Sequence, residues 1–159
     1  MEKGDLIKLS VSILVCIGAA VVGSFFTTPA IPTWYAALQK PSFNPPNWLF
    51  GPVWTALYLM MAVAAFLVWR QGLDKVAVKL ALGLFGVQLM LNTAWSLLFF
   101  GLRSPLLGLI DIGLLWLAIA GTLAAFLKVS TAAGLLLCPY LAWVSFAALL
   151  NFSLWRLNG

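Results

Sequence analysis

Residues 105–127 read "PLLGLIDIGLLWLAIAGTLAAFL" and contain one charged side chain, Asp111. This run is longer than the roughly 20 apolar residues that an α-helix needs to cross the hydrocarbon core of a bilayer. The rest of the chain has the same character, because 64% of its 159 residues are hydrophobic and only 8% are charged. Soluble globular domains carry about 25% charged residues, which give them a polar surface. The sequence therefore predicts an integral membrane protein.

Four further apolar runs are long enough to span a membrane, and they cover residues 6–26, 48–69, 80–100 and 132–154. Only the first connection, about residues 27–47, is long; the others are short, so helices that follow one another there must be antiparallel. Pro139 lies inside the last run and removes one helix hydrogen bond, which predicts a bend just before Tyr140. We expect a single all-α transmembrane domain over residues 1–159, a bundle of five helices with a short helix in the first loop.

The basic residues indicate the orientation of this bundle in the membrane. One side is expected to carry Lys3, Lys8, Arg70, Lys75, Lys79 and Lys128, and the other carries Lys40, Arg103 and Arg156. Because cytoplasmic loops are enriched in Lys and Arg, the N-terminus is predicted to be cytoplasmic, with the C-terminus and the first loop on the opposite side. The net charge of +5 is too scattered for a nucleic-acid interface, so we expect no nucleic-acid partner.

Three of the predicted spans carry polar and aromatic residues on one helical face, at offsets of about 4 and 7 positions. These residues are Trp54 and Tyr58 in the second span, Gln88, Asn92 and Trp95 in the third, and Trp143, Ala147 and Leu150 in the fifth. Facing inward, they can line an apolar cavity with a few polar groups, which is the usual composition of a small-molecule site. They can also simply lock the helices together, since amides bridge transmembrane helices. Both interpretations stay open from spacing alone.

Asp111 is the only acidic residue within a span. It can contact a ligand, accept a structural hydrogen bond from a partner such as Asn92 or a tyrosine, or extend toward the membrane interface. The chain has no histidine, which excludes a histidine-ligated haem, a histidine-based metal site and a Ser-His-Asp hydrolase. We therefore expect no metal site and no required cofactor, and favour recognition of a flat apolar ligand by stacking on Trp and Tyr rings.

The first connection is unusual for a linker, because residues 32–52 read "PTWYAALQKPSFNPPNWLFGP". Pro32 suits the first turn of a short helix, and the later prolines keep the chain extended and lower the entropy cost of an ordered loop. We interpret the segment as a semi-rigid lid over the cavity, with an interfacial helix resting on lipid headgroups as the alternative. The expected lid residues are Trp34, Pro41, Phe43, Pro45 and Pro46.

Three motifs resemble one family. They are "WYAALQKPSFNPPNWLFGPVWTALYLMM" (34–61), "GVQLMLNTAWSLLFFG" (86–101) and "CPYLAWVSFAALLNFSLWRLN" (138–158). Their order and spacing are similar to those of the TspO/MBR family, which includes the translocator proteins, also called peripheral-type benzodiazepine receptors, and the bacterial tryptophan-rich sensory proteins. The resemblance implies a five-helix bundle, usually a homodimer, with one cavity under the first loop. It also implies binding of porphyrins such as protoporphyrin IX and haem, and of benzodiazepine-type ligands.

The resemblance also assigns site residues. The family's pocket motif falls on Trp54, Asn92, Trp95, Trp143 and Ala147, whereas Tyr58, Gln88 and Asp111 match positions that line or adjoin the cavity, and Trp34, Pro41, Pro45 and Pro46 match the signature loop. Two positions depart from the pattern. Phe43 stands where the loop signature commonly has Trp, so a stacking ring remains but an N–H donor is lost. Phe152 stands where the proposed sterol motif needs Tyr, so cholesterol binding is not expected, while binding of other lipids stays open.

The resemblance leaves three kinds of function to be separated. The first is a porphyrin-binding membrane protein that acts as a sensor, scavenger or transporter in tetrapyrrole and oxidative-stress regulation. The second is an enzyme that degrades porphyrin in light, with Trp54 and Trp143 as its candidate catalytic residues. The third is a channel or a carrier for lipids or sterol-like molecules, although the chain shows no internal repeat of the kind that many carriers contain.

Overall fold

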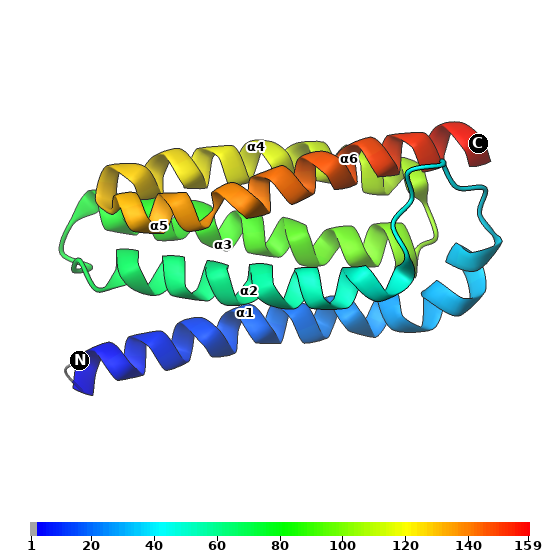
Figure 1. Cartoon of the computed structure of the whole chain (residues 1–159). Coiled ribbons are helices and arrows are strands. Elements are labelled where there is room, and N and C mark those ends of the chain that lie inside the picture. Colours follow the sequence, from blue (N-terminus) through cyan, green and yellow to red (C-terminus); the bar gives the residue numbers. More distant parts are fainter. Residues whose placement is uncertain (1–2) are drawn as a thin grey trace.

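The computed structural model describes residues 3–159 and is built from helices that run lengthwise beside one another (Figure 1). They are α1 (Lys3–Ala30), α2 (Asn47–Trp69), α3 (Val76–Ser96), α4 (Pro105–Val129), α5 (Thr131–Leu136) and α6 (Cys138–Asn158). π-helical turns at Ile31–Tyr35 and Leu97–Gly101 extend α1 and α3. The five segments long and apolar enough to cross a membrane are Lys3–Tyr35, Asn47–Trp69, Val76–Gly101, Pro105–Val129 and Thr131–Asn158. The prediction of an all-α bundle with five spans is confirmed.

The helices pack in a ring rather than in chain order. α1 packs against α2 and α3, α3 against α4, α4 against both α5 and α6, and α5 closes the ring against α2. Large apolar side chains such as Leu14 and Phe25 remain 70% and 76% exposed on the outside. An apolar outer surface costs nothing in lipid, so this arrangement suits a multi-pass integral membrane protein.

The first helix is longer than predicted, and it includes the residues that were expected to form a separate short helix. Pro29 and Pro32 both lie within this continuous helical segment. A proline has no N–H to donate to the carbonyl four residues back, and the chain accommodates Pro32 in a wider π-helical turn. The Thr33 hydroxyl donates to the Pro29 carbonyl at 2.8 Å, which satisfies one of the acceptors in this turn. The segment therefore continues the helix to the start of the first loop and packs Tyr35 against Phe99 and Phe100.

The fifth span is interrupted where Pro139 predicted a bend. α5 ends at Leu136, Leu137 forms the junction, and α6 begins at Cys138 with Pro139 in its first turn. On one side of this junction α5 packs closely against α2, whereas α6 does not. The break therefore lets the last helix diverge from α2, and the space between them becomes available for a cavity.

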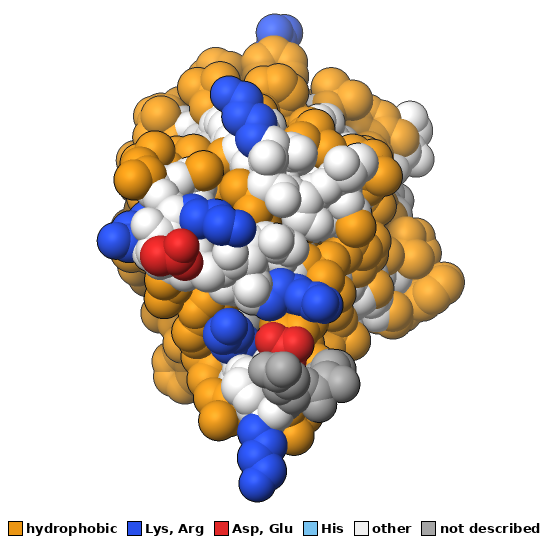
Figure 2. All heavy atoms as spheres, turned by 90° about the vertical axis from the view of Figure 1, so that its left-hand side faces the viewer, with side chains coloured by type: hydrophobic (Ala, Val, Ile, Leu, Met, Phe, Trp, Pro, Cys, Tyr) orange, Lys and Arg blue, Asp and Glu red, His pale blue; other side chains and the backbone are white. Residues whose placement is uncertain are grey.

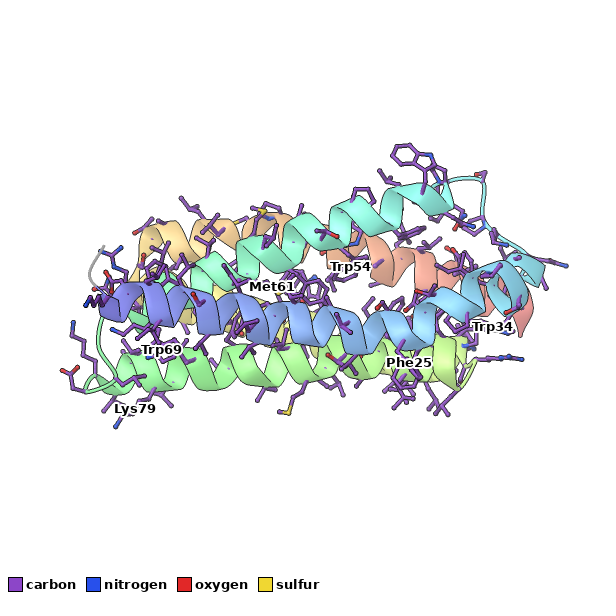
Figure 3. The ribbon with its side chains drawn as sticks, turned by 90° about the horizontal axis from the view of Figure 1, so that it is seen from below. Phe25, Trp34, Trp54, Met61, Trp69 and Lys79 are labelled. Carbon is purple, nitrogen blue, oxygen red and sulfur yellow. The ribbon has the colours of Figure 1, made fainter. Side chains whose placement is uncertain are left out.

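Basic side chains gather at one end of the bundle. Figure 2 shows Lys and Arg spread over the end that carries the N-terminus and the α2–α3 loop, with acidic side chains between them. Lys79 and Trp69 mark this end in Figure 3, and Trp34 marks the opposite end. The separation of charge that was expected from the sequence is therefore present in the folded chain, although it does not by itself place either end in the cytoplasm.

Candidate functional site

A cavity of about 600 Å³ lies between α1, α2, α3 and α6, at the end of the bundle beside the first loop. Its size falls within the roughly 300–1,000 Å³ typical of small-molecule sites. None of the residues that line it is Asp, Glu, Lys or Arg. The cavity can therefore hold an apolar ligand without burying an uncompensated protein charge, and any charged group of a ligand has to lie at the rim.

A chain of buried hydrogen bonds forms the deep end of this cavity. The Tyr58 hydroxyl donates to Oδ1 of Asn92 at 2.5 Å, and Nδ2 of Asn92 donates to the Tyr140 hydroxyl at 2.7 Å. The Tyr140 hydroxyl in turn donates to Oε1 of Gln88 at 2.7 Å. Asn92 thus joins α2, α3 and α6, and its carboxamide orientation is fixed by a donor on one side and an acceptor on the other.

Aromatic rings form the side walls. The Trp54 ring centroid lies 5.9 Å from that of Tyr58 and 6.3 Å from that of Tyr140. On α6 the Trp143 ring lies 6.1 Å from Phe50, and its Nε1–H is buried without a hydrogen-bond partner among residues 3–159. Buried donors are normally paired, so this indole is an unsatisfied donor within the cavity wall.

A second set of hydrogen bonds stabilises the cavity wall near the first loop. Nε1 of Trp95 donates to Oδ1 of Asn151 at 3.0 Å, and Nδ2 of Asn151 donates to the Pro105 carbonyl at 2.8 Å. The Trp95 ring stacks on Phe99 with centroids 5.0 Å apart. Trp95 therefore presents its ring to the cavity while its N–H is already used, which is the reverse of the arrangement at Trp143.

The structure brings most of the predicted site residues together. The cavity is lined by Trp54, Tyr58, Asn92, Trp95, Trp143, Ala147 and Leu150. Gln88 and Asp111 were expected beside them but do not line it. Gln88 lies behind Tyr140, with its Nε2 3.7 Å from Sδ of Met61. Asp111 is on α4, which contributes no wall residue; its side chain is 5% exposed, and its Oδ2 is buried without a hydrogen-bond partner.

The lid residues contact the rim rather than the cavity itself. The Trp34 ring packs on Phe99 at 5.4 Å, and the Phe43 ring packs on Phe146 at 6.3 Å. None of the predicted lid residues lines the cavity, because the prolines lie in the middle of the loop and the chain enters the wall only at its two ends. The residues that do line it there are Tyr35, Asn47 and Trp48.

The cavity wall that the first helix forms was not predicted from the sequence. It comes from α1 and includes Ile17, Ala20, Ser24 and Thr27. These residues are small or aliphatic and lack the aromatic and amide pattern that marked the other helices. The available signal was the spacing of Ala20, Ser24 and Thr27, which places small side chains on one face of the helix.

The cavity is open between α1 and α2. Val21 of α1 and Trp48 of α2 both line it, yet they are 61% and 71% exposed. Ser24 and Thr55 are also exposed along the same edge. This opening lies on the outer surface of a membrane-spanning bundle, so it faces the lipid and not only the aqueous phase at the end of the helices.

Comparison with known proteins agrees with this geometry. The sequence model of the TspO/MBR family matches residues 12–156. The tryptophan-rich protein TspO of Chlorobaculum tepidum is 49% identical over 97% of this chain and 98% of its own length. The human translocator protein is 46% identical over 86% of this chain and 82% of its own. The tryptophan-rich sensory protein of Cereibacter sphaeroides is 39% identical over 87% of both chains. The chain belongs to the TspO/MBR family.

Proposed function

We propose that this protein binds porphyrins and similar flat apolar ligands in the cavity between α1, α2, α3 and α6, as part of tetrapyrrole or oxidative-stress regulation. Membership in the TspO/MBR family supports a role as a membrane sensor or transporter. The identity of the ligand as a porphyrin goes one step beyond family membership. The observation that carries it is an uncharged cavity of about 600 Å³ with aromatic rings in the walls from α2, α3 and α6.

The composition of the cavity favours a large aromatic ligand over a lipid chain. Trp54, Tyr58, Trp95 and Trp143 offer ring faces or edges on more than one side, and aromatic pairs contribute about 0.5–1.5 kcal/mol beyond burial of area. The Nε1–H of Trp143 is buried and unpartnered, and a turn of the ring toward the cavity would let it donate to an acceptor in the ligand. Haem is compatible as a ligand only without a histidine axial ligand, since the chain contains none.

Quenching of tryptophan fluorescence by protoporphyrin IX tests this proposal. We expect saturable quenching for the purified protein in detergent, and an affinity about three- to tenfold lower for Trp143→Phe, because the ring is kept but one hydrogen-bond donor is lost. Trp116→Phe is the matched control, since Trp116 lies outside the cavity and its Nε1 donates to the Ser145 hydroxyl at 2.8 Å. Equal affinities for the wild type and both variants would show that the Trp143 donor takes no part in binding, and quenching that does not saturate would contradict binding itself.

A second candidate function is light-dependent porphyrin breakdown. It is favoured by the position of two indoles, Trp54 and Trp143, on different walls of the same cavity. A photoexcited macrocycle in the cavity would take an electron from a nearby indole and pass it to molecular oxygen, leaving an indole radical cation and superoxide, and the superoxide would then oxidise the macrocycle. Under light and oxygen, Trp54→Phe should then bind protoporphyrin IX but form less product than the wild type. Equal bleaching in empty detergent micelles would reject this function.

A further inference from the structure

The last residue of α6 holds the first loop by a pair of hydrogen bonds across 119 positions of sequence. Oδ1 of Asn158 accepts from the Gln39 backbone N–H at 2.9 Å, and Nδ2 of Asn158 donates to the Gln39 carbonyl at 2.9 Å. The same Nδ2 also donates to the Leu154 carbonyl of its own helix at 2.9 Å. Asn158 thus provides hydrogen-bond partners for both the N–H and the C=O of Gln39, as an adjacent β-strand would.

These two hydrogen bonds are the main ones that join the middle of the first loop to the rest of the bundle. Within residues 3–159, the other hydrogen bonds of residues 36–46 stay inside the loop or reach the adjoining ends of the first helix and of α2. One of these joins the Tyr35 hydroxyl to Oδ1 of Asn44 at 2.7 Å. These contacts shape the loop, but only Asn158 fastens it by hydrogen bonds to α6. Figure 1 shows the loop passing beside the C-terminal end of that helix.

The fastened loop is continuous with the cavity wall. Phe43 packs on Phe146 at 6.3 Å, and Phe146 packs on the cavity residue Trp143 at 5.5 Å. At the loop's two ends, Tyr35 and Asn47 line the cavity themselves. If the middle of the loop moves away from α6, the Phe43 contact with Phe146 is lost, and the loop that joins the lining residues Tyr35 and Asn47 is free to open this end of the cavity.

The geometry points to Asn158 as a positioning residue: we propose that its carboxamide is a latch that keeps the first loop closed over the cavity, and that opening of this latch sets how fast a bound porphyrin leaves. Control of porphyrin release rests on the proposed function, whereas closure of the loop by Asn158 does not. Both partners are exposed, so water can replace the two bonds at small net cost. Exposed hydrogen bonds at a helix end belong to the part of a fold that opens most readily.

Hydrogen exchange without any ligand tests the latch. In Asn158→Ala the amide of Gln39 should exchange at least about tenfold faster than in the wild type, because its acceptor is gone. The buried indole N–H of Trp143 should also exchange faster if the loop covers the cavity. In Asn158→Asp the shape is kept and one oxygen can still accept, but the carboxylate faces the carbonyls of Gln39 and Leu154, so the amide should again lose protection.

Two variants serve as controls. Gln39→Ala should behave like the wild type, because only the backbone of Gln39 takes part. Ser153→Ala removes a side-chain bond to a carbonyl four residues back in the same helix, at 3.0 Å, but no contact with the loop. Unchanged exchange of the Gln39 amide in Asn158→Ala would overturn the latch. Faster exchange of that amide with unchanged exchange at Trp143 would show that the loop is latched without covering the cavity, which overturns the lid.

Stopped-flow measurement of protoporphyrin IX dissociation tests whether the latch controls how fast the ligand leaves. We expect the dissociation rate constant of Asn158→Ala to rise about tenfold over that of the wild type and of both controls. An unchanged rate with an unprotected Gln39 amide would assign ligand exit to the opening between α1 and α2 and overturn the proposal that the latch controls it. A wild type that does not bind protoporphyrin IX at all would contradict the proposed function, while the exchange data would still decide the latch.

Discussion

Asn92 shows at the scale of one residue why pocket and packing could not be separated from sequence. The spacing of Asn92, Trp95 and their counterparts fitted either a cavity wall or a bridge between helices. In the structure Asn92 does both, because it lines the cavity and joins Tyr58 of α2 to Tyr140 of α6. The sequence identified the residue but not its partners, since the choice of hydrogen bonds depends on where three separate helices meet. Gln88, which shares the spacing of Asn92, and Asp111, which matches a family position lining or adjoining the cavity, do not line it.

Tyr140→Phe should destabilise the bundle more than Tyr58→Phe. Loss of the Tyr140 hydroxyl leaves both Nδ2 of Asn92 and Oε1 of Gln88 without a partner in a buried site, and each unsatisfied group costs about 1–3 kcal/mol. Loss of the Tyr58 hydroxyl affects only Oδ1 of Asn92, at the cavity wall. Thermal unfolding in detergent, followed by circular dichroism, measures both variants. A midpoint for Tyr140→Phe at or above that of Tyr58→Phe would contradict this description of the network.

At the scale of helices, proline marked where a helix is irregular but not which form the irregularity takes. Pro139 predicted the interruption between α5 and α6 that lets the last helix diverge from α2. Pro32 was expected to start a separate helix, but it lies in a π-helical turn that continues α1. The wall from α1 carried no aromatic signal, and its hydroxyls bond to their own helix, as Thr27 does to the Gly23 carbonyl at 3.0 Å. These residues contribute to the cavity by leaving space for a ligand, and nothing in their residue types distinguishes them from small residues that only pack between helices.

Gly108 allows α4 to lie close to α3 and α6, and Gly108→Ala tests this contact. An added Cβ would lie 2.8 Å from a ring carbon of Phe99 and 2.9 Å from Oδ1 of Asn151, so the acceptor of the Trp95 indole has to shift. Overpacking of this kind costs about 1–3 kcal/mol. Gly113→Ala in the same helix meets nothing within 4 Å and should be neutral or slightly stabilising, since Ala favours a helix over Gly by about 1 kcal/mol. Thermal midpoints in detergent that fall equally would show that helix flexibility, not this contact, is affected.

At the scale of the whole molecule, the sequence predicted the number of spans and the separation of charge between the two ends, because hydrophobic length and basic residues are properties of composition. It could not predict the ring order of the helices or the opening between α1 and α2, since these depend on packing between distant segments. The orientation in the membrane stays a prediction that follows from charge alone.

Labelling of single cysteines tests that orientation. With Cys16 and Cys138 replaced by Ala, we expect a membrane-impermeant maleimide to label Ser42→Cys in intact cells but to label Gln71→Cys only after lysis. The first position lies in the first loop, and the second lies in the loop between α2 and α3; both are exposed. The reverse pattern would place the first loop in the cytoplasm.

The most direct test of the central claim is to fill the cavity and measure the dissociation constant of protoporphyrin IX. Ala147 lines the cavity, whereas Ala142 of the same helix is exposed and does not. We predict that Ala147→Trp raises the dissociation constant at least about tenfold, or about 1.4 kcal/mol, while Ala142→Trp leaves it unchanged. Equal dissociation constants for these two variants and the wild type would show that the porphyrin binds outside the cavity.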